Sequence, residues 1–484
     1  MAFAAFEYWA SSGFGPARAA DRTNAMGQVS FDLGDDWSLR LLATFHAGRF
    51  DSPGVVLQSD LDRPSFDRFS SYDPDQGGAS SRAHVLAELA YAGPAWEAKL
   101  SPFVARRTLE LQFNFTGGLG DEASDNAVQQ NDFTTVGLRA SLARDLPLFA
   151  DSDRVELGVF ARHDDIDQLH RSTDGAVTFA DADVTATNAA AYLDIALHPL
   201  PRTVVRGGIR VDGLFFATED ALDASPEARK ASGVHVGPKA TVDVAIRHDL
   251  HALASYGKGF RSPQARSLVD GESTPFTDVH AFEGGLRYNG GPALSVTAAG
   301  FASLLSDDLV FNESTSRNEA VPATLRAGGT VDMQNRVGEL VHAFSVTYTR
   351  ASFRGSDSRF DEGDLVPFVP QVLLRSDVAY TPVLATLLDR ELRGHFGVGV
   401  DGLARRPLPF GEIGSDILLF DASMGLRLRE VELRVDAQNL LDTRYNDAEF
   451  VYASNWGADP SPLPRRHASV GSPLTVLGTL ALHL

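Results

Sequence analysis

Apolar and polar residues alternate along many separate segments of this chain, and this period of two limits the possible folds more than any other feature. In one segment, apolar side chains at odd positions alternate with charged side chains at even positions: Val205, Ile209, Val211 and Phe215 against Arg206, Arg210 and Asp212. The pattern recurs in segments 37–46, 239–247, 371–380 and 430–437. Because successive side chains of a strand point to opposite faces, each segment predicts a β-strand with one apolar and one charged face.

An amphipathic strand can cover a soluble core or separate lipid from a wet lumen, so alternation alone leaves both open. The lengths favour the membrane, because these segments run about 9 to 12 residues, enough for a tilted strand to cross the hydrocarbon layer. Short links also alternate with long polar stretches, as in a membrane barrel. The short links are 34–36, 93–95, 199–201, 248–249 and 289–292; the long stretches lie around 47–82, 114–131, 164–187, 217–232, 259–275, 355–366, 405–416 and 446–470.

These observations predict an all-β fold, a large antiparallel transmembrane β-barrel of about 18 to 22 strands with short periplasmic turns and long extracellular loops. We expect the sheet to close into a cylinder, with outer-membrane lipid on the apolar faces and a wet, charged lumen inside. No stretch of roughly 18 apolar residues runs without a charge, so no helical span is expected.

Charge and cysteine content exclude several other classes of protein. The formal net charge is −21, with 64 acidic against 43 basic residues. A nucleic-acid backbone would be repelled unless one face were locally basic, and no basic run is present, so we expect no nucleic-acid partner. The chain has no cysteine, which removes disulfides and thiolate metal sites.

The sequence also indicates no enzyme, no catalytic residue, no metal site and no cofactor. His-Glu-x-x-His, Gly-x-Ser-x-Gly and the phosphate-cradling Gly-x-x-x-x-Gly-Lys are all missing. His163 and Asp164, Asp165 and Asp167 would need a loop to gather them around a metal, and we interpret them as a solvated outer loop. The acidic stretch from Asp357 to Asp364 lacks the spacing of a calcium loop.

Three short motifs in the second half of the chain carry a family resemblance. The first is Phe260-Arg261-Ser262-Pro263, and the second contains Glu283, Gly285 and Arg287. The third follows an alternating segment near the chain end and contains Gln438, Asn439, Leu440, Asp442 and Tyr445, with a terminal apolar run over 474–484. Their order and spacing over 256–484 resemble the barrel of TonB-dependent outer-membrane receptors. The first half matches only in its general barrel pattern.

The resemblance implies a transport receptor in the bacterial outer membrane that imports a scarce nutrient, such as a ferric siderophore or another metal chelate. Residues 1–484 correspond to the barrel alone, since no signal peptide, TonB box or plug is found, and we expect the chain to be N-terminally incomplete. TonB is then a partner only if such segments exist upstream, and a monomer is expected. The alternatives are a passive porin-like channel, and further a soluble all-β protein or an outer-membrane hydrolase, against which the motifs and the rim asymmetry count.

Arginines on the charged faces allow two interpretations. Arg206, Arg210, Arg375 and Arg434 point into the lumen if the apolar faces contact lipid, where they could attract an anionic chelate or contact a plug. Alternatively they pair with acidic residues of neighbouring strands, as is common in charged barrel interiors. We favour pairing.

Overall fold

The computed structural model describes residues 1–118, 126–222, 229–261, 276–312, 317–387, 389–457 and 461–483. Its elements are, in chain order, β1 (Ala2–Ser11), β2 (Ala20–Asp32), β3 (Trp37–Ser52), β4 (Val56–Leu57), α1 (Gln58–Leu61), β5 (Gln76–Ala92), β6 (Glu97–Asn114), β7 (Asn126–Asp145), β8 (Arg154–Ser172), β9 (Thr178–Leu200), β10 (Thr203–Asp220), β11 (Arg229–Arg247), β12 (Leu250–Arg261), β13 (Thr277–Asn289), η1 (Gly291–Ala293), β14 (Leu294–Leu305), β15 (Asp308–Asn312), β16 (Arg317–Val321), β17 (Thr324–Val337), β18 (Leu340–Phe353), β19 (Val372–Tyr380), β20 (Val383–Leu387), β21 (Arg390–Ala404), η2 (Pro409–Gly411), β22 (Ile417–Leu428), β23 (Val431–Gln438), β24 (Asn446–Ser454), β25 (Ser461–Val470) and β26 (Thr475–Leu482).

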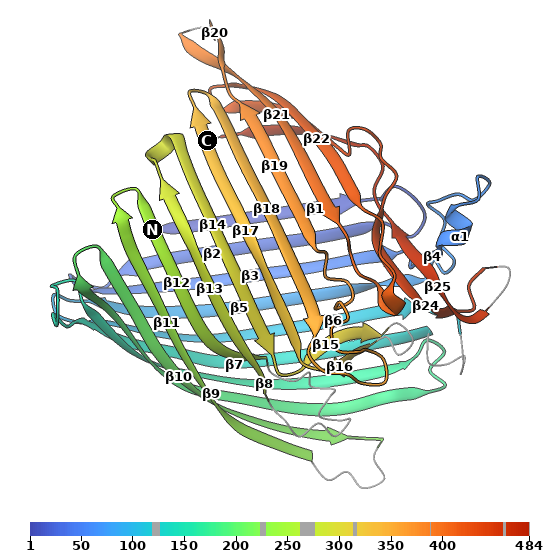
Figure 1. The fold of residues 1–484 in the computed structure, drawn as a ribbon, viewed down its shortest axis with the longest axis horizontal. Coiled ribbons are helices and arrows are strands. Elements are labelled where there is room, and N and C mark those ends of the chain that lie inside the picture. The colour runs from blue at the N-terminus through green and yellow to red at the C-terminus, as the bar shows by residue number, and fades with distance from the viewer. Residues whose placement is uncertain are drawn as a thin grey trace.

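One antiparallel sheet of 21 strands forms the wall of the molecule, which confirms the predicted fold class and strand count. Each wall strand pairs with its neighbour in sequence, and the ladder skips only β4, β15, β16, β24 and β25. β19 and β20 both pair with β21 and together make one position in the wall. The sheet curls round, so that β2, β3 and β5 pass behind the strands from β12 to β18 (Figure 1).

The register of the sheet separates the two faces as the alternation predicted. On one face, Val205 of β10 lies opposite Val242 of β11, and Val211 lies opposite Val236. Ile209 and Val211 remain 43% and 41% exposed, and similar apolar side chains recur around the wall. An apolar surface of this extent is typical of a protein covered by lipid.

Helical structure is limited to α1, with four residues, and to the three-residue turns η1 and η2. In the described ranges, no helix has the length and apolar character to cross a membrane.

One of the predicted long loops is wrong. Residues 164–187, predicted as a polar loop, belong almost entirely to β8 and β9, which are joined by residues 173–177 alone. His163, Asp164, Asp165 and Asp167 are therefore strand residues whose side chains alternate between faces. β9 reaches 23 residues, well beyond the predicted 9 to 12. Strands that continue past the hydrocarbon layer carry polar side chains on both faces, so the apolar signal ends before the strand does.

The predicted long connection 446–470 does join wall strands β23 and β26, but it contains two strands that were not predicted. These strands, β24 and β25, pair with β4 in a separate three-stranded sheet. We call this sheet the clasp. β24 and β25 lie in the chain between β23 and β26, whereas β4 lies between β3 and β5. The clasp also contacts the segment after β6, because Tyr452 Oη and Trp456 Nε1 donate to the carbonyl of Phe115 at 2.8 and 2.7 Å. It therefore joins the last strands of the wall to the first ones.

The contacts of the clasp matter for the connection between the first and last strands, because the wall is interrupted between β1 and β26. In the part of the chain that the structure describes, no backbone hydrogen bond joins β1 to β26, so the expected closure between them is not observed.

Two buried polar groups hold the clasp together. Glu449 is fully buried and accepts hydrogen bonds from Arg406 Nη2 at 2.9 Å and from the Ser415 backbone at 2.7 Å. Burial alone would raise the pKa of Glu449, but these hydrogen bonds outweigh it and hold the pKa below its usual value. His467, also fully buried, stacks on Tyr452 at 4.0 Å, and burial lowers its pKa to about 4.

We predict that the clasp loses stability as the pH falls from about 6.5 toward 5. An unfolded histidine has a pKa of about 6.5. Below this pH His467 is protonated in the opened clasp but stays neutral in the folded clasp, so protonation stabilises the opened state. The loss would approach roughly 3 kcal/mol near pH 4, where the contribution of Glu449 also begins to fall. Urea titration at pH 7 and pH 5, followed by the fluorescence of Trp456 with the other tryptophans replaced, measures it. His467→Gln should flatten the dependence, and an equal pH dependence in both proteins would contradict the prediction.

We also predict that Val242→Arg impairs assembly far more than Thr241→Arg. The two residues are neighbours on β11, but Val242 shares the apolar face with Val205, whereas Thr241 lies opposite Arg206 on the charged face. An arginine facing the middle of the hydrocarbon layer costs about 2–4 kcal/mol. The shift in gel mobility between heated and unheated samples reports folded barrel in outer-membrane fractions, and equal yields would overturn the face assignment.

Candidate functional site

The third sequence motif organises the turn that follows β23. Asn439 is almost fully buried and adopts a left-handed backbone with φ of 49°, which asparagine tolerates better than most residues. Its Oδ1 accepts from the Thr443 backbone at 2.8 Å, and its Nδ2 donates to the carbonyls of Thr443 and Ser472 at 3.0 Å. Its own backbone N–H donates to Asp421 of β22. This one side chain therefore connects β22, the turn and the segment before β26.

The other members of this motif contact the same neighbours. Gln438 pairs with Thr475 of β26, and the Leu440 backbone N–H donates to Phe420 of β22. Asp442 Oδ1 accepts from the Leu474 backbone at 3.0 Å. The ring of Tyr445 lies against Gly471, where an added Cβ would be 2.2 Å from ring carbons. The motif thus has a structural role in ending β23 and starting β26.

The mid-chain motifs lie on β12 and β13. Phe260 packs between His235 and Phe276, each with a ring centroid 4.8 Å away, and Arg261 donates to the Thr277 hydroxyl at 3.3 Å. Ser262 and Pro263 lie outside the described residues.

In the neighbouring motif, Glu283 is exposed and lies opposite Ser255. Gly285 is required by a close approach of two strands, because an added Cβ would lie 2.4 Å from the Ala298 carbonyl oxygen. Arg287 forms an ion pair with Asp243 at 3.3 Å.

Most of the four arginines proposed for the lumen have acidic partners. Arg210 Nη2 lies 2.8 Å from Asp212, and Arg434 Nε lies 2.9 Å from Asp436. In both cases the partner is two residues along the same strand, and not on a neighbouring strand as expected, because residues i and i+2 share a face.

Arg375 forms ion pairs both with Asp377 on its own strand and with Asp401 on the neighbouring strand β21. Arg206 is exposed and forms no ion pair within the described ranges.

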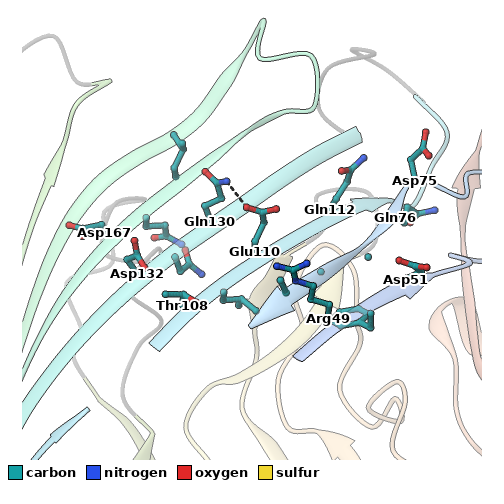
Figure 2. Close-up of a pocket in the computed structure, with 18 of the residues that line it drawn as sticks. Arg49, Asp51, Asp75, Gln76, Thr108, Glu110, Gln112, Gln130, Asp132 and Asp167 are labelled. Carbon is teal, nitrogen blue, oxygen red and sulfur yellow. Dashed lines mark hydrogen bonds between the residues drawn. The ribbon is translucent and has the colours of Figure 1, made fainter. Parts of the chain in front are cut away.

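A cavity of 870 Å³ lies over β3 and β5 to β9 and is strongly acidic (Figure 2). Arg49 is the one basic residue in its described lining, against Asp51, Asp75, Glu110, Asp132, Asp167, Asp181 and Asp183. Gln130 Nε2 donates to Glu110 at 2.7 Å, a pair visible in the figure. Glu110 and Gln130 continue the face on which Val104 and Val136 lie opposite each other, so this acidic cavity belongs to the outer face of the wall.

No group of three or more acidic or histidine side chains among the described residues has the arrangement to hold a metal ion.

A second cavity, of 840 Å³, lies on the opposite, charged face over β6 to β12, and we call it the wall pocket. Its basic residues are Arg107, Arg139, Arg162, Arg210, Lys239 and Lys258. Four carboxylates also line it, and Phe160, Tyr192, Phe216 and Phe260 supply aromatic rings. Among these charged and aromatic residues, Asp164, Arg210, Asp212 and Phe260 were singled out from the sequence. Strands β6 to β12 bring the others together through long-range pairing that no local pattern reveals.

Comparison with solved structures identifies this type of barrel. The ferric citrate transporter FecA, in its unliganded form, superposes with a TM-score of 0.79 at 15% identity, covering 99% of this chain and 73% of that chain. The ferric-catecholate import receptor Fiu of E. coli K12 gives 0.76 at 13%, covering 100% and 77%. The ferric yersiniabactin uptake receptor FyuA of Yersinia pestis gives 0.73 at 15%, covering 99% and 74%.

Sequence comparison points to the same group of proteins. No curated protein matches the sequence. The family model described as TonB dependent receptor-like, beta-barrel, matches residues 4–440. Proteins of this family are transport receptors of the outer membrane and not enzymes, in agreement with the expectation from the sequence. With far more than half of its length matched, the chain belongs to the TonB-dependent receptor β-barrel family.

Proposed function

We propose that this barrel is the membrane-spanning part of a receptor that takes up a scarce nutrient, in the first place a ferric siderophore. The family match over residues 4–440 carries the proposal. Proteins with similar structures include the ferric citrate transporter FecA, the ferric yersiniabactin uptake receptor FyuA and the copper transporter OprC, so metal complexes are the favoured class of ligand. The lining of the wall pocket, with charged and aromatic side chains together, supports the binding of such a complex inside the barrel.

In this proposal the chain acts as a monomer in the bacterial outer membrane, and it performs no covalent chemistry. Ligand is captured by the outer segments and the lumen. If a plug and a TonB-contacting segment precede the barrel, release into the periplasm is powered through TonB. The charged face of the wall provides a wet passage once the plug has moved.

We expect uptake of radioactive iron, supplied as a panel of ferric chelates, to fall several-fold when the gene is deleted and to return when it is restored. A protonophore should abolish this uptake, because the transport depends on energy from the inner membrane. Uptake that persists with the protonophore and rises in proportion to external chelate would instead indicate a passive channel. Uptake unaffected by the deletion for every chelate would refute the proposal.

A further inference from the structure

We infer that the wall pocket recognises an anionic ligand through Arg107 and Arg139, and specifically a metal chelate that presents carboxylate oxygens. This inference rests on the proposed function, since it names the chemical class of the cargo. The pocket lies on the charged face of the sheet, because Arg210 and Asp212 in its lining stand on either side of Val211, whose side chain faces lipid.

The charge of the pocket is opposite to that of the protein. The chain carries a formal charge of −21, yet six basic and four acidic residues line this cavity. The acidic cavity on the outer face follows the general trend, with seven carboxylates and one arginine. A positive concave surface inside an acidic protein concentrates anions locally, and low-dielectric walls strengthen that effect.

Most of the basic residues in the pocket are already neutralised. Arg162 Nε lies 2.7 Å from Asp164, and Arg210 Nη2 lies 2.8 Å from Asp212. Lys239 Nζ lies 2.8 Å from Asp194, and Lys258 Nζ lies 2.9 Å from Asp278 just outside the lining. Because these four side chains already have carboxylate partners, they are not available to neutralise an anionic ligand.

Arg107 and Arg139 differ from the other basic residues, because neither forms an ion pair within the described part of the chain. The guanidinium of Arg107 lies over the ring of Phe133, 4.5 Å from its centroid, which holds the side chain without neutralising it. Arg139 is exposed on the same face of β7 as Phe133. With Asp278 included as the partner of Lys258, six basic groups face five carboxylates, of which only Glu156 has no basic partner among the described residues. The surplus positive charge therefore resides on the guanidinium groups of Arg107 and Arg139 and is reduced in part by Glu156.

Guanidinium groups select the class of anion. Each presents a planar set of N–H donors that matches the two oxygens of a carboxylate, and such charge-assisted pairs are stronger than neutral hydrogen bonds. The remaining carboxylate of the lining, Glu156, is engaged by the Tyr192 hydroxyl at 2.8 Å. Phe160 lies beneath Arg210, with 5.4 Å between ring centroid and guanidinium carbon, and offers an apolar surface to the body of a ligand.

The test measures binding of ferric citrate, an anionic carboxylate chelate, to the purified full chain in detergent at about 0.1 M salt, where charges are only partly screened. We expect Arg107→Gln and Arg139→Gln each to weaken binding at least tenfold. The affinity of Arg107→Lys should lie between those of wild type and Arg107→Gln, because lysine keeps the positive charge but lacks the planar set of N–H donors. An uncharged ferric trihydroxamate should bind the wild type and these variants alike.

Arg49→Gln is the matched control, since it removes one positive charge from the acidic cavity on the other face and should leave the affinity unchanged. Heat-dependent gel mobility establishes that each variant is folded. The inference is overturned if wild type binds no ferric citrate, or if folded Arg107→Gln and Arg139→Gln bind as tightly as wild type. Energy-dependent uptake of another chelate, with these binding results negative, would leave the proposed function intact and remove only this inference.

Discussion

Backbone hydrogen bonding in a medium without water is the constraint on which this structure depends. A buried N–H or C=O group without a partner costs several kcal/mol in hydrocarbon, so the ladder between neighbouring strands must be nearly complete. The prolines of the wall follow this rule. Pro238 of β11 still lies opposite Ile209 of β10, but the ladder to β12 begins only at Lys239. Pro382 separates β19 from β20. The residue that cannot donate thus stands where a ladder ends or is interrupted.

The same constraint explains which parts of the fold the sequence could predict. Inside the hydrocarbon layer one face must be apolar, so Ile209 and Val211 give an alternating signal that is local and easy to read. Beyond the layer that requirement ends, and the segment 164–187 is strand although its composition is that of a loop. β24 and β25 were missed for another reason. They are stabilised by contacts with Phe115 and Leu57, more than 300 residues away, and alternation carries no information about such partners.

The candidate site could be predicted even less than the fold. Period two correctly separates the charged face from the apolar one, and it shows that an arginine and an aspartate two residues apart can pair, as Arg210 and Asp212 do. It does not show which arginine is left without a partner. That depends on the register of β6 against β7 and of β7 against β8, which brings Arg139 beside Phe160 and leaves Arg107 over Phe133. The positions of these two unpaired arginines therefore depend on three strands together.

In a wall where each strand pairs only with its neighbours, few contacts fix distant parts of the sheet relative to one another. Here residues of the C-terminal segment provide such contacts. Asn439 joins β22 to the start of β26, and Glu449 joins the loop at Ser415 to β24. Both side chains are buried and accept or donate several hydrogen bonds, which is stabilising only when every partner is present. These contacts connect neighbouring elements at the end of the wall. The pairing of β25 with β4 and the hydrogen bonds from Tyr452 and Trp456 to Phe115 then connect that end to the first strands.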